Sequence, residues 1–414
     1  MPGFELWGDE ERKEVNEVLE TGILMRYGFD SLRKGIWKSK ELEAAICKRF
    51  GARYAQLTSS GTSALTTAFA ALGIGAGDEV IMPSFTFVAS FESVLSVGAT
   101  PVLVDVDETL TMNPESVKKA ISSKTKAIVP VHMCGSMADL DALLTITKEH
   151  NLILLEDACQ SIGASYKGRA VGTIGHAGTF SFDFVKIMTC GEGGVVLTND
   201  ESVYIKCDGY TDHGHDHKGG ADRGADQHPF IGYNYRISEL HAAVGLAQVR
   251  KLDSFLDIQR RNHGYLKNIL SNVPEITFRT IPDPDGDSCT FLSWFLPTEE
   301  ITRNVVNELK GQGALAGNFY WYDNNWHYIR KWDHLKNYVS LHALNNDQQA
   351  ALKKLQTQDF SASDAVMGRC VSTAISLLWS EEQIRERGEK IVGAIKKLLG
   401  EQSIPACVKL HLPT

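Results

Sequence analysis

The stretch Leu152-Ile-Leu-Leu-Glu-Asp-Ala-Cys-Gln160 decides the fold. Its apolar first half predicts a buried strand, and two carboxylates, Glu156 and Asp157, stand where that strand ends. Acidic side chains just past the carboxyl end of a parallel strand lie at the crevice where open α/β sheets bind ligands. A carboxylate there could pair with a protonated ring nitrogen, and a solvated strand end is the alternative.

Similar apolar runs recur before and after this stretch. From about residue 53 to 200 they alternate with helical patterns, which is the order expected of a parallel sheet covered by helices. The sequence therefore predicts an α/β fold of three layers, α/β/α, around a mostly parallel sheet. The expected strands are Arg53–Leu57, Glu79–Pro83, Thr100–Val106, Ala127–His132, Leu152–Glu156, Gly178–Phe182 and Gly194–Thr198, with helices at Gly61–Leu72, Pro114–Ala120 and Asp139–His150.

The pattern changes after about residue 235. A long helical run is followed by the strand-like Glu275–Thr280 and by a last helix that opens with a capping-box pattern at Ser380. We expect a large domain at 1–255 and a smaller α+β domain at 256–414.

Composition excludes several classes of protein. Apolar types make up 43% of the 414 residues and charged types 22%, which is typical of a soluble globular protein. The net charge of −9 disfavours nucleic acid as a partner. Neither a membrane span nor a signal peptide is predicted, so we expect a cytoplasmic protein. The eight cysteines occur singly, which predicts reduced, mostly buried thiols and no metal site.

A second motif, Leu57-Thr-Ser-Ser-Gly-Thr-Ser-Ala-Leu65, runs from a strand through small residues into a helix. Helix N-termini present free N–H groups and the positive end of a dipole, so this turn can hold a phosphate, with hydroxyl donors from Thr62 and Ser63. An ordinary capped helix is the alternative. The stretch lacks the patterns of a nucleotide P-loop and of a dinucleotide fold, which argues against a nucleoside triphosphate.

Lys186 lies in a third motif, Phe180-Ser-Phe-Asp-Phe-Val-Lys-Ile-Met-Thr-Cys-Gly-Glu-Gly-Gly194. Apolar surroundings desolvate its amine and weaken the preference for the charged state. Such an amine could attack a carbonyl carbon and form a Schiff base, or the side chain could simply reach out to water. The glycine-rich turn beside it allows a close approach of the backbone.

The fourth motif, Gly232-Tyr-Asn-Tyr-Arg-Ile-Ser-Glu-Leu-His-Ala-Ala-Val-Gly245, places Asn234 and Arg236 before an amphipathic helix, which Asn234 could alternatively cap. The preceding residues 211–229 are polar and rich in glycine. We interpret them as a mobile loop over the mouth of the site. A metal site formed by the alternating His213, His215 and His217 is the alternative.

Taken together, these stretches resemble the DegT/DnrJ/EryC1/StrS family of sugar aminotransferases, which are pyridoxal-phosphate enzymes with the aspartate-aminotransferase fold (fold type I). The resemblance covers about residues 40 to 255, in the order and spacing of the family. It rests on Ser-Gly-Thr-Ser-Ala-Leu at 60–65, Gly-Asp-Glu-Val-Ile-Met-Pro-Ser-Phe-Thr-Phe at 77–87, Glu-Asp-Ala-Cys-Gln at 156–160, Ser-Phe-Asp-Phe-Val-Lys at 181–186 and Gly-Tyr-Asn-Tyr-Arg at 232–236.

The resemblance implies a role for each of these side chains. Lys186 would hold the cofactor covalently and, once the substrate amine releases it, move a proton between the cofactor carbon and the substrate carbon. Asp157 would keep the pyridine nitrogen protonated. A homodimer with shared active sites is implied as well. The other implied cofactor contacts are Gln160 at the ring hydroxyl, Phe87 on the ring face, Gly61, Thr62, Ser63 and Ser181 at the phosphate, and Asn234 from the second subunit.

The resemblance further implies glutamate as the amino donor and a keto- or aldehyde-sugar as the acceptor. The N-terminal segment and Leu-Met-Arg-Tyr-Gly at 24–28 are similar to members that aminate carbon 8 of oxidised 3-deoxy-manno-octulosonate for lipopolysaccharide. That substrate carries a carboxylate, for which Arg26, Arg236 and Arg330 are candidate partners. The aromatic run at 318–328 could line the sugar pocket or pack in the core.

Three other functions stay open at this point. A nucleotide-linked 4-keto or 3-keto sugar could be the acceptor. A sugar dehydratase of the same fold would carry histidine where Lys186 stands, and a non-catalytic pyridoxal-phosphate sensor would carry a DNA-binding unit.

Overall fold

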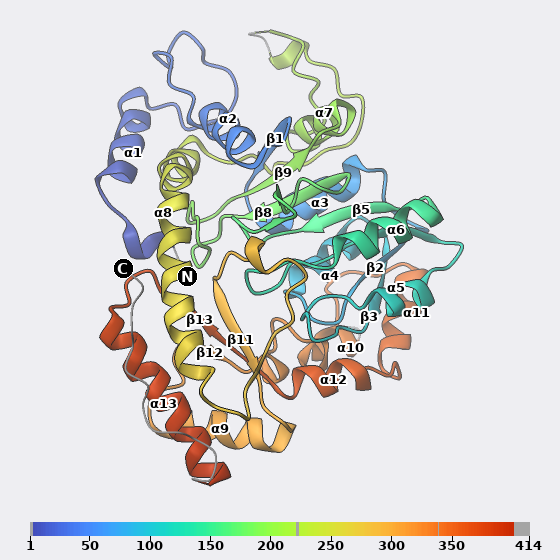
Figure 1. Ribbon diagram of the computed structural model, residues 1–414. Helices are drawn as coiled ribbons and strands as arrows, with labels where there is room; N and C mark the ends of the chain where they lie inside the picture. Colours follow the sequence, from blue (N-terminus) through green and yellow to red (C-terminus); the bar gives the residue numbers. More distant parts are fainter. Residues whose placement is uncertain (1–2, 221–222, 338, 401–414) are drawn as a thin grey trace.

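The computed structural model describes residues 3–220, 223–337 and 339–400. Its centre is a seven-stranded sheet in the order β1-β9-β8-β5-β4-β2-β3 (Figure 1). Strand β9 is antiparallel to β1 and to β8, and the other neighbouring pairs are parallel. The strands are β1 (Tyr54–Thr58), β2 (Glu79–Pro83), β3 (Thr100–Val104), β4 (Thr125–Ile128), β5 (Ile153–Asp157), β8 (Ala177–Ser181) and β9 (Gly194–Thr198).

Helices pack on both faces of this sheet. Leu154 of β5 packs in an apolar cluster with α2, α6 and α8, whereas its neighbour Leu155 packs in a second cluster with α3, α4 and α7. A strand covered on both faces has no solvated side, which explains its unbroken apolar run. The predicted three layers are therefore confirmed. The helices are α1 (Asp9–Thr21), α2 (Lys38–Phe50), α3 (Gly61–Ala71), α4 (Val88–Ser96), α5 (Pro114–Ala120), α6 (Leu140–His150), α7 (Glu201–Tyr210) and α8 (Glu239–Leu270).

Strands β3 and β4 end two or more residues earlier than the apolar pattern predicts. Strand β4 stops at Ile128 because Pro130 has no N–H to continue the ladder, although Val131 still forms a parallel bridge to Asp157. Strand β3 stops at Val104, after which Val106 bridges Met112 in an antiparallel turn.

The C-terminal part has its own antiparallel sheet, in the order β10-β11-β13-β12. Helix α8 joins it to the large sheet, because Phe255 packs in the first cluster and Leu266 in a third, C-terminal cluster. Since α8 runs unbroken across residue 255, the boundary there stays a prediction. This part contains β10 (Thr277–Phe278), β11 (Phe291–Phe295), α9 (Glu299–Gly311), β12 (Asn318–Phe319), α10 (Asp333–Lys336), α11 (Asn346–Leu355), α12 (Ser361–Met367), β13 (Cys370–Ala374) and α13 (Glu381–Leu399).

Short elements complete the chain. Strands β6 (Ser165–Tyr166) and β7 (Arg169–Ala170) form a hairpin. The 3-10 helices are η1 (Gly3–Leu6), η2 (Arg223–Ala225), η3 (Pro284–Gly286), η4 (Trp321–Asp323) and η5 (Ile329–Lys331). Within the described ranges, no helix has both the length and the apolar character needed to cross a membrane. The seven cysteines there are free, and Cys407 lies outside the described residues.

Candidate active site

Asp157 ends β5 with a buried side chain whose two oxygens each accept one hydrogen bond. Ser90 Oγ, from α4, donates to Oδ2 at 2.6 Å, and the backbone N–H of Cys159 donates to Oδ1 at 3.2 Å. These two donors fix the plane of the carboxylate. Sequence reasoning missed Ser90, because its link to Asp157 exists only in the folded protein.

The neighbouring acid, Glu156, points the other way. It is fully buried, bonded to His132 Nε2 at 3.1 Å and to the backbone N–H groups of Gly172, Ile174 and Gly175. Burial acts to raise the pKa of Glu156, but the bond from His132 and the backbone donors outweigh it and lower the pKa. Glu156 therefore anchors a loop, and Asp157 alone of the two acids is directed to the site.

The turn before α3 closely approaches the end of β8. A Cβ on Gly61 would lie 2.7 Å from Ser181 Cβ and 3.4 Å from Cys159 Sγ, so only glycine fits there. Ser63 is buried, and its hydroxyl belongs to the capping box with Ser60, whereas Thr62 is exposed. Thr62 is therefore the hydroxyl of this turn that is free to meet a phosphate.

Gly61→Ala is expected to weaken cofactor binding about 5- to 150-fold, because overpacking of about 1–3 kcal/mol must push α3 away from Ser181. The measurement is titration of the apoenzyme with pyridoxal phosphate. Gly264→Ala is the control, since a Cβ there meets nothing within 4 Å. Equal affinity of the two variants would contradict the tight contact.

Lys186 follows β8 in a turn closed by its own N–H, which donates to the carbonyl of Asp183 at 3.0 Å. The side chain is half-buried and, among the described residues, makes no ion pair. Burial raises the pKa of the Cys159 thiol, the charge of Asp157 raises it further, and the charge of Lys186 opposes them. The charges of Lys186 and Asp157 therefore act on the same thiol, which indicates that both side chains lie in its vicinity.

Gln160 and Phe87 both lie next to His327, a residue that the sequence analysis did not single out. Gln160 Nε2 lies 3.0 Å from His327 Nε2, and the rings of Phe87 and His327 are 5.3 Å apart. Burial lowers the pKa of His327 to about 3, and the charge of Lys186 adds to this. His327 comes from the aromatic run at 318–328. Trp321 of this run is buried in the core, as one alternative expected, whereas a sugar-lining role for the run, whose Trp326 is 61% exposed, stays a prediction.

The three candidate arginines are all paired with carboxylates. Arg26 is buried and binds Glu43 at 2.6 Å, Arg236 binds Asp212 at 2.5 Å, and Arg330 binds both oxygens of Asp364 through Nε at 3.0 Å. A substrate carboxylate would have to compete with these partners. Their role in substrate binding stays a prediction.

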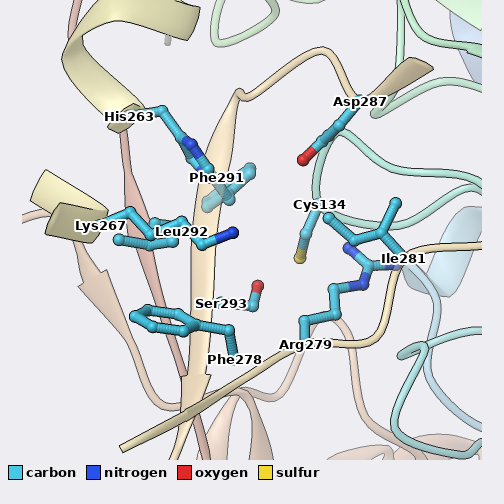
Figure 2. A pocket seen from close by; sticks show the side chains of 10 residues that line it. All are labelled: Cys134, His263, Lys267, Phe278, Arg279, Ile281, Asp287, Phe291, Leu292 and Ser293. Atoms are coloured by element: carbon cyan, nitrogen blue, oxygen red, sulfur yellow. The ribbon is translucent and has the colours of Figure 1, made fainter. Parts of the chain in front are cut away.

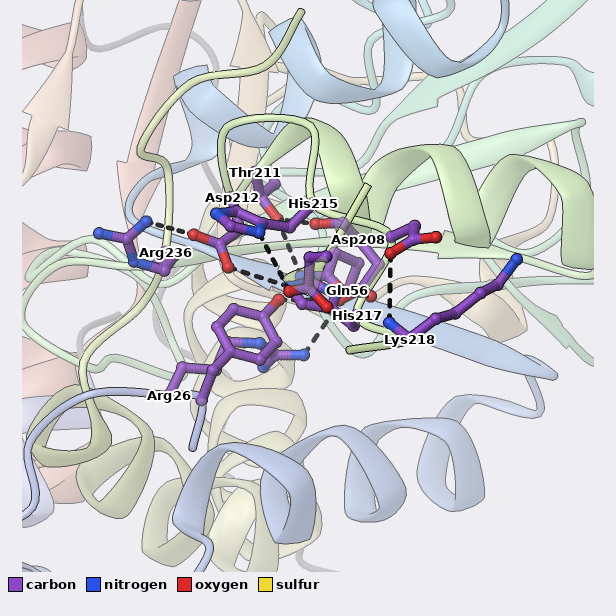
Figure 3. Close-up of polar contacts among 12 residues, drawn as sticks. Arg26, Gln56, Asp208, Thr211, Asp212, His215, His217, Lys218 and Arg236 are labelled. Carbon is purple, nitrogen blue, oxygen red and sulfur yellow. Dashed lines mark hydrogen bonds and ion pairs between the residues drawn. The ribbon is translucent and has the colours of Figure 1, made fainter. Parts of the chain in front are cut away.

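The described part of the loop at 211–229 is held by a polar network (Figure 3). Buried Asp212 accepts hydrogen bonds from His217 Nε2 at 2.9 Å, Arg223 Nη2 at 2.7 Å and Arg236 Nη1. His217 Nδ1 lies 2.6 Å from Asp208, so carboxylates occupy both of its ring nitrogens. His217 is thus a structural cation rather than a candidate metal ligand.

Stability should depend on the charge of His217. Burial acts to lower the pKa of this ring, but its bonds to Asp208 and Asp212 outweigh it and raise the pKa to about 9. A pKa raised above the ordinary 6.5 gives a stabilisation that is complete below pH 6.5 and is lost as the pH rises through about 9. His217→Gln should therefore lower the urea midpoint at about pH 6 and leave it unchanged at about pH 10. The control is the exposed His150→Gln, and an equal loss for His217→Gln at both pH values would refute the assignment.

A small cavity elsewhere, lined mainly by α8 and by β10, β11 and the segment between them, contains none of the predicted site residues (Figure 2). It is lined by buried Arg279 with Lys267, His263 and Asp287. Arg279 donates to the carbonyls of Thr109 and Met133, and burial raises the pKa of Asp287 to about 6. Lys186 and Asp157 do not line this cavity and therefore lie at a different place in the fold.

Residues 6–386 match the pattern of the DegT/DnrJ/EryC1/StrS aminotransferase family. The chain belongs to this family. A curated relative, the GDP-perosamine synthase of Caulobacter vibrioides, is 40% identical over 234 residues, which are 56% of this chain. The match spans 62% of that relative, less than two thirds of its length.

Two solved structures share the fold over nearly the whole chain. An aminotransferase from Psychrobacter cryohalolentis is 26% identical with a TM-score of 0.80, covering 95% of this chain and 98% of that one. The E. coli GDP-4-keto-6-deoxy-D-mannose-3-dehydratase with bound hydrated pyridoxal phosphate is 25% identical with a TM-score of 0.77, covering 93% and 97%. The predictions of fold, family and a pyridoxal-phosphate-dependent enzyme are confirmed.

The residues of the site fit this cofactor. Lys186, which has no ion-pair partner in the part of the chain that the structure describes, can take the aldehyde. A carboxylate with fixed orientation stands at the strand end, and Phe87 offers an apolar ring that is 36% exposed. Gly61 brings the N-terminus of α3 close to Ser181, and the exposed Thr62 lies in the first turn of that helix, where N–H donors suit a phosphate. The individual contacts of these residues remain proposals.

Proposed function

We propose that this protein transfers an amino group from glutamate to the carbonyl carbon of a keto- or aldehyde-sugar. The observation that carries the proposal is half-buried Lys186, which makes no ion pair within the described residues, in a chain of this family. Its charge acts on the same thiol, Cys159, as the charge of buried Asp157. Pyridoxal phosphate, when bound, supplies an aldehyde that condenses with amines and a ring that accepts an electron pair. A dehydratase of this fold is not favoured, because lysine rather than histidine stands at position 186.

The chain's own residues would divide the work. Lys186 Nζ would hold the cofactor and, when freed, would move a proton from the donor carbon to the cofactor carbon, acting first as a general base and then as a general acid. Asp157 holds the proton on the ring nitrogen, with Ser90 and Cys159 fixing its oxygens. Phe87 supplies a flat face that excludes water from one side of the ring.

A homodimer with shared sites completes the proposal. Asn234 is exposed, and its backbone bridges Asp212, the centre of the polar network. We propose that Asn234 binds the cofactor phosphate in the partner subunit. Mixing two inactive variants, Lys186→Ala and Asn234→Ala, should restore activity, because each mixed dimer has one intact site. No recovery after subunit exchange would refute shared sites.

Our first choice of acceptor is the C8 aldehyde of oxidised 3-deoxy-manno-octulosonate, an intermediate for lipopolysaccharide, because the segment at 24–28 is similar to such enzymes. The relative that makes GDP-perosamine supports a second candidate, a nucleotide-linked 4-keto or 3-keto sugar. In both cases the protein supplies an amine to a sugar carbonyl.

One experiment separates the two acceptors and tests the donor. Glutamate alone should bleach the visible absorption of the bound cofactor and release 2-oxoglutarate. The aminated cofactor form is then mixed with each sugar, and the correct one restores the absorption. If no amino acid bleaches the band, the donor half-reaction is wrong, and a cofactor sensor becomes the better hypothesis.

A further inference from the structure

A chain of hydrogen bonds runs from the aromatic run at 318–328 into the site, and each of its bonds has a defined donor and acceptor. It links Asn324, His327 and Gln160, with 2.9 Å between Asn324 Oδ1 and His327 Nδ1 and 3.0 Å between His327 Nε2 and Gln160 Nε2. Gln160 Oε1 accepts the N–H of Cys134 at 3.4 Å. Both ends of this hydrogen-bond chain, Asn324 and Gln160, therefore accept a hydrogen bond from a backbone N–H group.

The two backbone donors fix the direction of every bond between them. The N–H of Trp326 donates to Asn324 Oδ1 at 2.9 Å, so the oxygen of that amide faces His327, and Nδ1 must carry the proton. The N–H of Cys134 likewise turns the oxygen of Gln160 away and its NH₂ toward His327. His327 Nε2 must then accept, which requires a neutral ring protonated at Nδ1.

The surroundings of His327 favour the neutral ring. Its side chain is enclosed by Trp321 and Phe87, with ring centroids 4.6 and 5.3 Å away. Burial and the nearby charge of Lys186 lower its pKa to about 3. The ring therefore stays an acceptor at neutral pH.

The neutral ring of His327 determines which amide group Gln160 presents to the site. One of its two amide hydrogens is taken by His327, and within the described residues the second has no acceptor. That second N–H is left to meet an oxygen in the site. If the ring were protonated, its Nε2–H would force the amide to turn, and Gln160 would present a carbonyl oxygen instead.

We propose that His327 is a positioning residue which, as a neutral acceptor held by Asn324, makes Gln160 a hydrogen-bond donor to the ring oxygen of the cofactor. This inference rests on the proposed function, since it assumes pyridoxal phosphate on Lys186. In this proposal His327 does not contact the reacting atoms, so its entire effect on cofactor binding passes through Gln160.

A double-mutant cycle tests this with cofactor affinity as the readout. The variants are His327→Leu, Gln160→Leu and the double variant, and each apoenzyme is titrated with pyridoxal phosphate while its absorption band is recorded. His327→Leu should weaken binding about tenfold and shift the band, as expected for one lost oriented hydrogen bond. In the Gln160→Leu background the same change should have no further effect on either quantity.

A conservative variant separates positioning from packing. The carbonyl of His327→Gln can occupy the place of Nε2 and accept from Gln160, so it should recover binding to within about threefold of the native protein. Additive losses in the cycle, or a His327→Gln variant as weak as His327→Leu, would overturn the proposal. If His327→Leu does not fold, His327→Asn replaces it, because its amide ends short of the Nε2 position.

Borohydride reduction and peptide mapping of the native protein and each variant complete the test. A reduced adduct at Lys186 throughout shows that the cofactor is attached, so a failed cycle then counts against His327 alone. No adduct in the native protein would reject the proposed function and, with it, this inference.

Discussion

Replacing Lys186 by alanine is expected to lower kcat/KM at least about 10⁴-fold, because in the proposed function the amine is both the covalent anchor and the proton carrier. The fold should be retained, since the side chain is half-buried and makes no ion pair within the described residues. The measurement is steady-state kinetics with glutamate, together with borohydride reduction and peptide mapping.

Lys167→Ala is the matched control for this prediction. Lys167 is an exposed lysine that pairs with Asp141 on the surface, so its loss should leave kcat/KM within about twofold. A Lys186→Ala enzyme with near-native turnover, or a reduced adduct mapped to another lysine in the native protein, would remove the basis of the proposed function.

The parts of the fold that repeat along the chain were predictable from sequence. Residues 152–155 are all apolar because β5 is covered on both faces, and such an apolar run can be recognised without a structure. The same holds for Gly61 and Lys186, whose neighbours in sequence form the turns that place them. The local structure of each motif could therefore be predicted from the sequence of that motif.

Contacts between distant segments could not be predicted in this way. Ser90 reaches Asp157 across 67 positions of sequence and Gln160 reaches His327 across 167. Nothing in the local pattern of α4 or of the aromatic run marks these side chains, because their role depends on how the layers pack. Likewise, the loop at 211–229 has a polar composition that suggests mobility, but the charges of Asp212 and His217 pair within it.

Asp157→Asn is expected to lower kcat about 10²- to 10⁴-fold while weakening cofactor binding less than about tenfold. The amide has the same shape, and the Ser90 hydroxyl can reverse its bond and accept from the new NH₂, so the site should keep its geometry. The charge that we propose holds a proton on the ring nitrogen is lost, however, and with it the stabilisation of negative charge developing on the ring. The effect should therefore appear in rate and not in affinity.

Single-turnover bleaching by glutamate measures the rate in Asp157→Asn, and titration of the apoenzyme measures the affinity. Ser90→Ala is the graded control, because it keeps the charge of Asp157 and removes only one of its two orienting donors. It should slow bleaching about tenfold or less, between the native enzyme and Asp157→Asn. If Asp157→Asn bleached as fast as the native enzyme, the carboxylate would not be the partner of the ring nitrogen. If its loss lay wholly in affinity, Asp157 would only bind the cofactor, and another group would have to hold the proton.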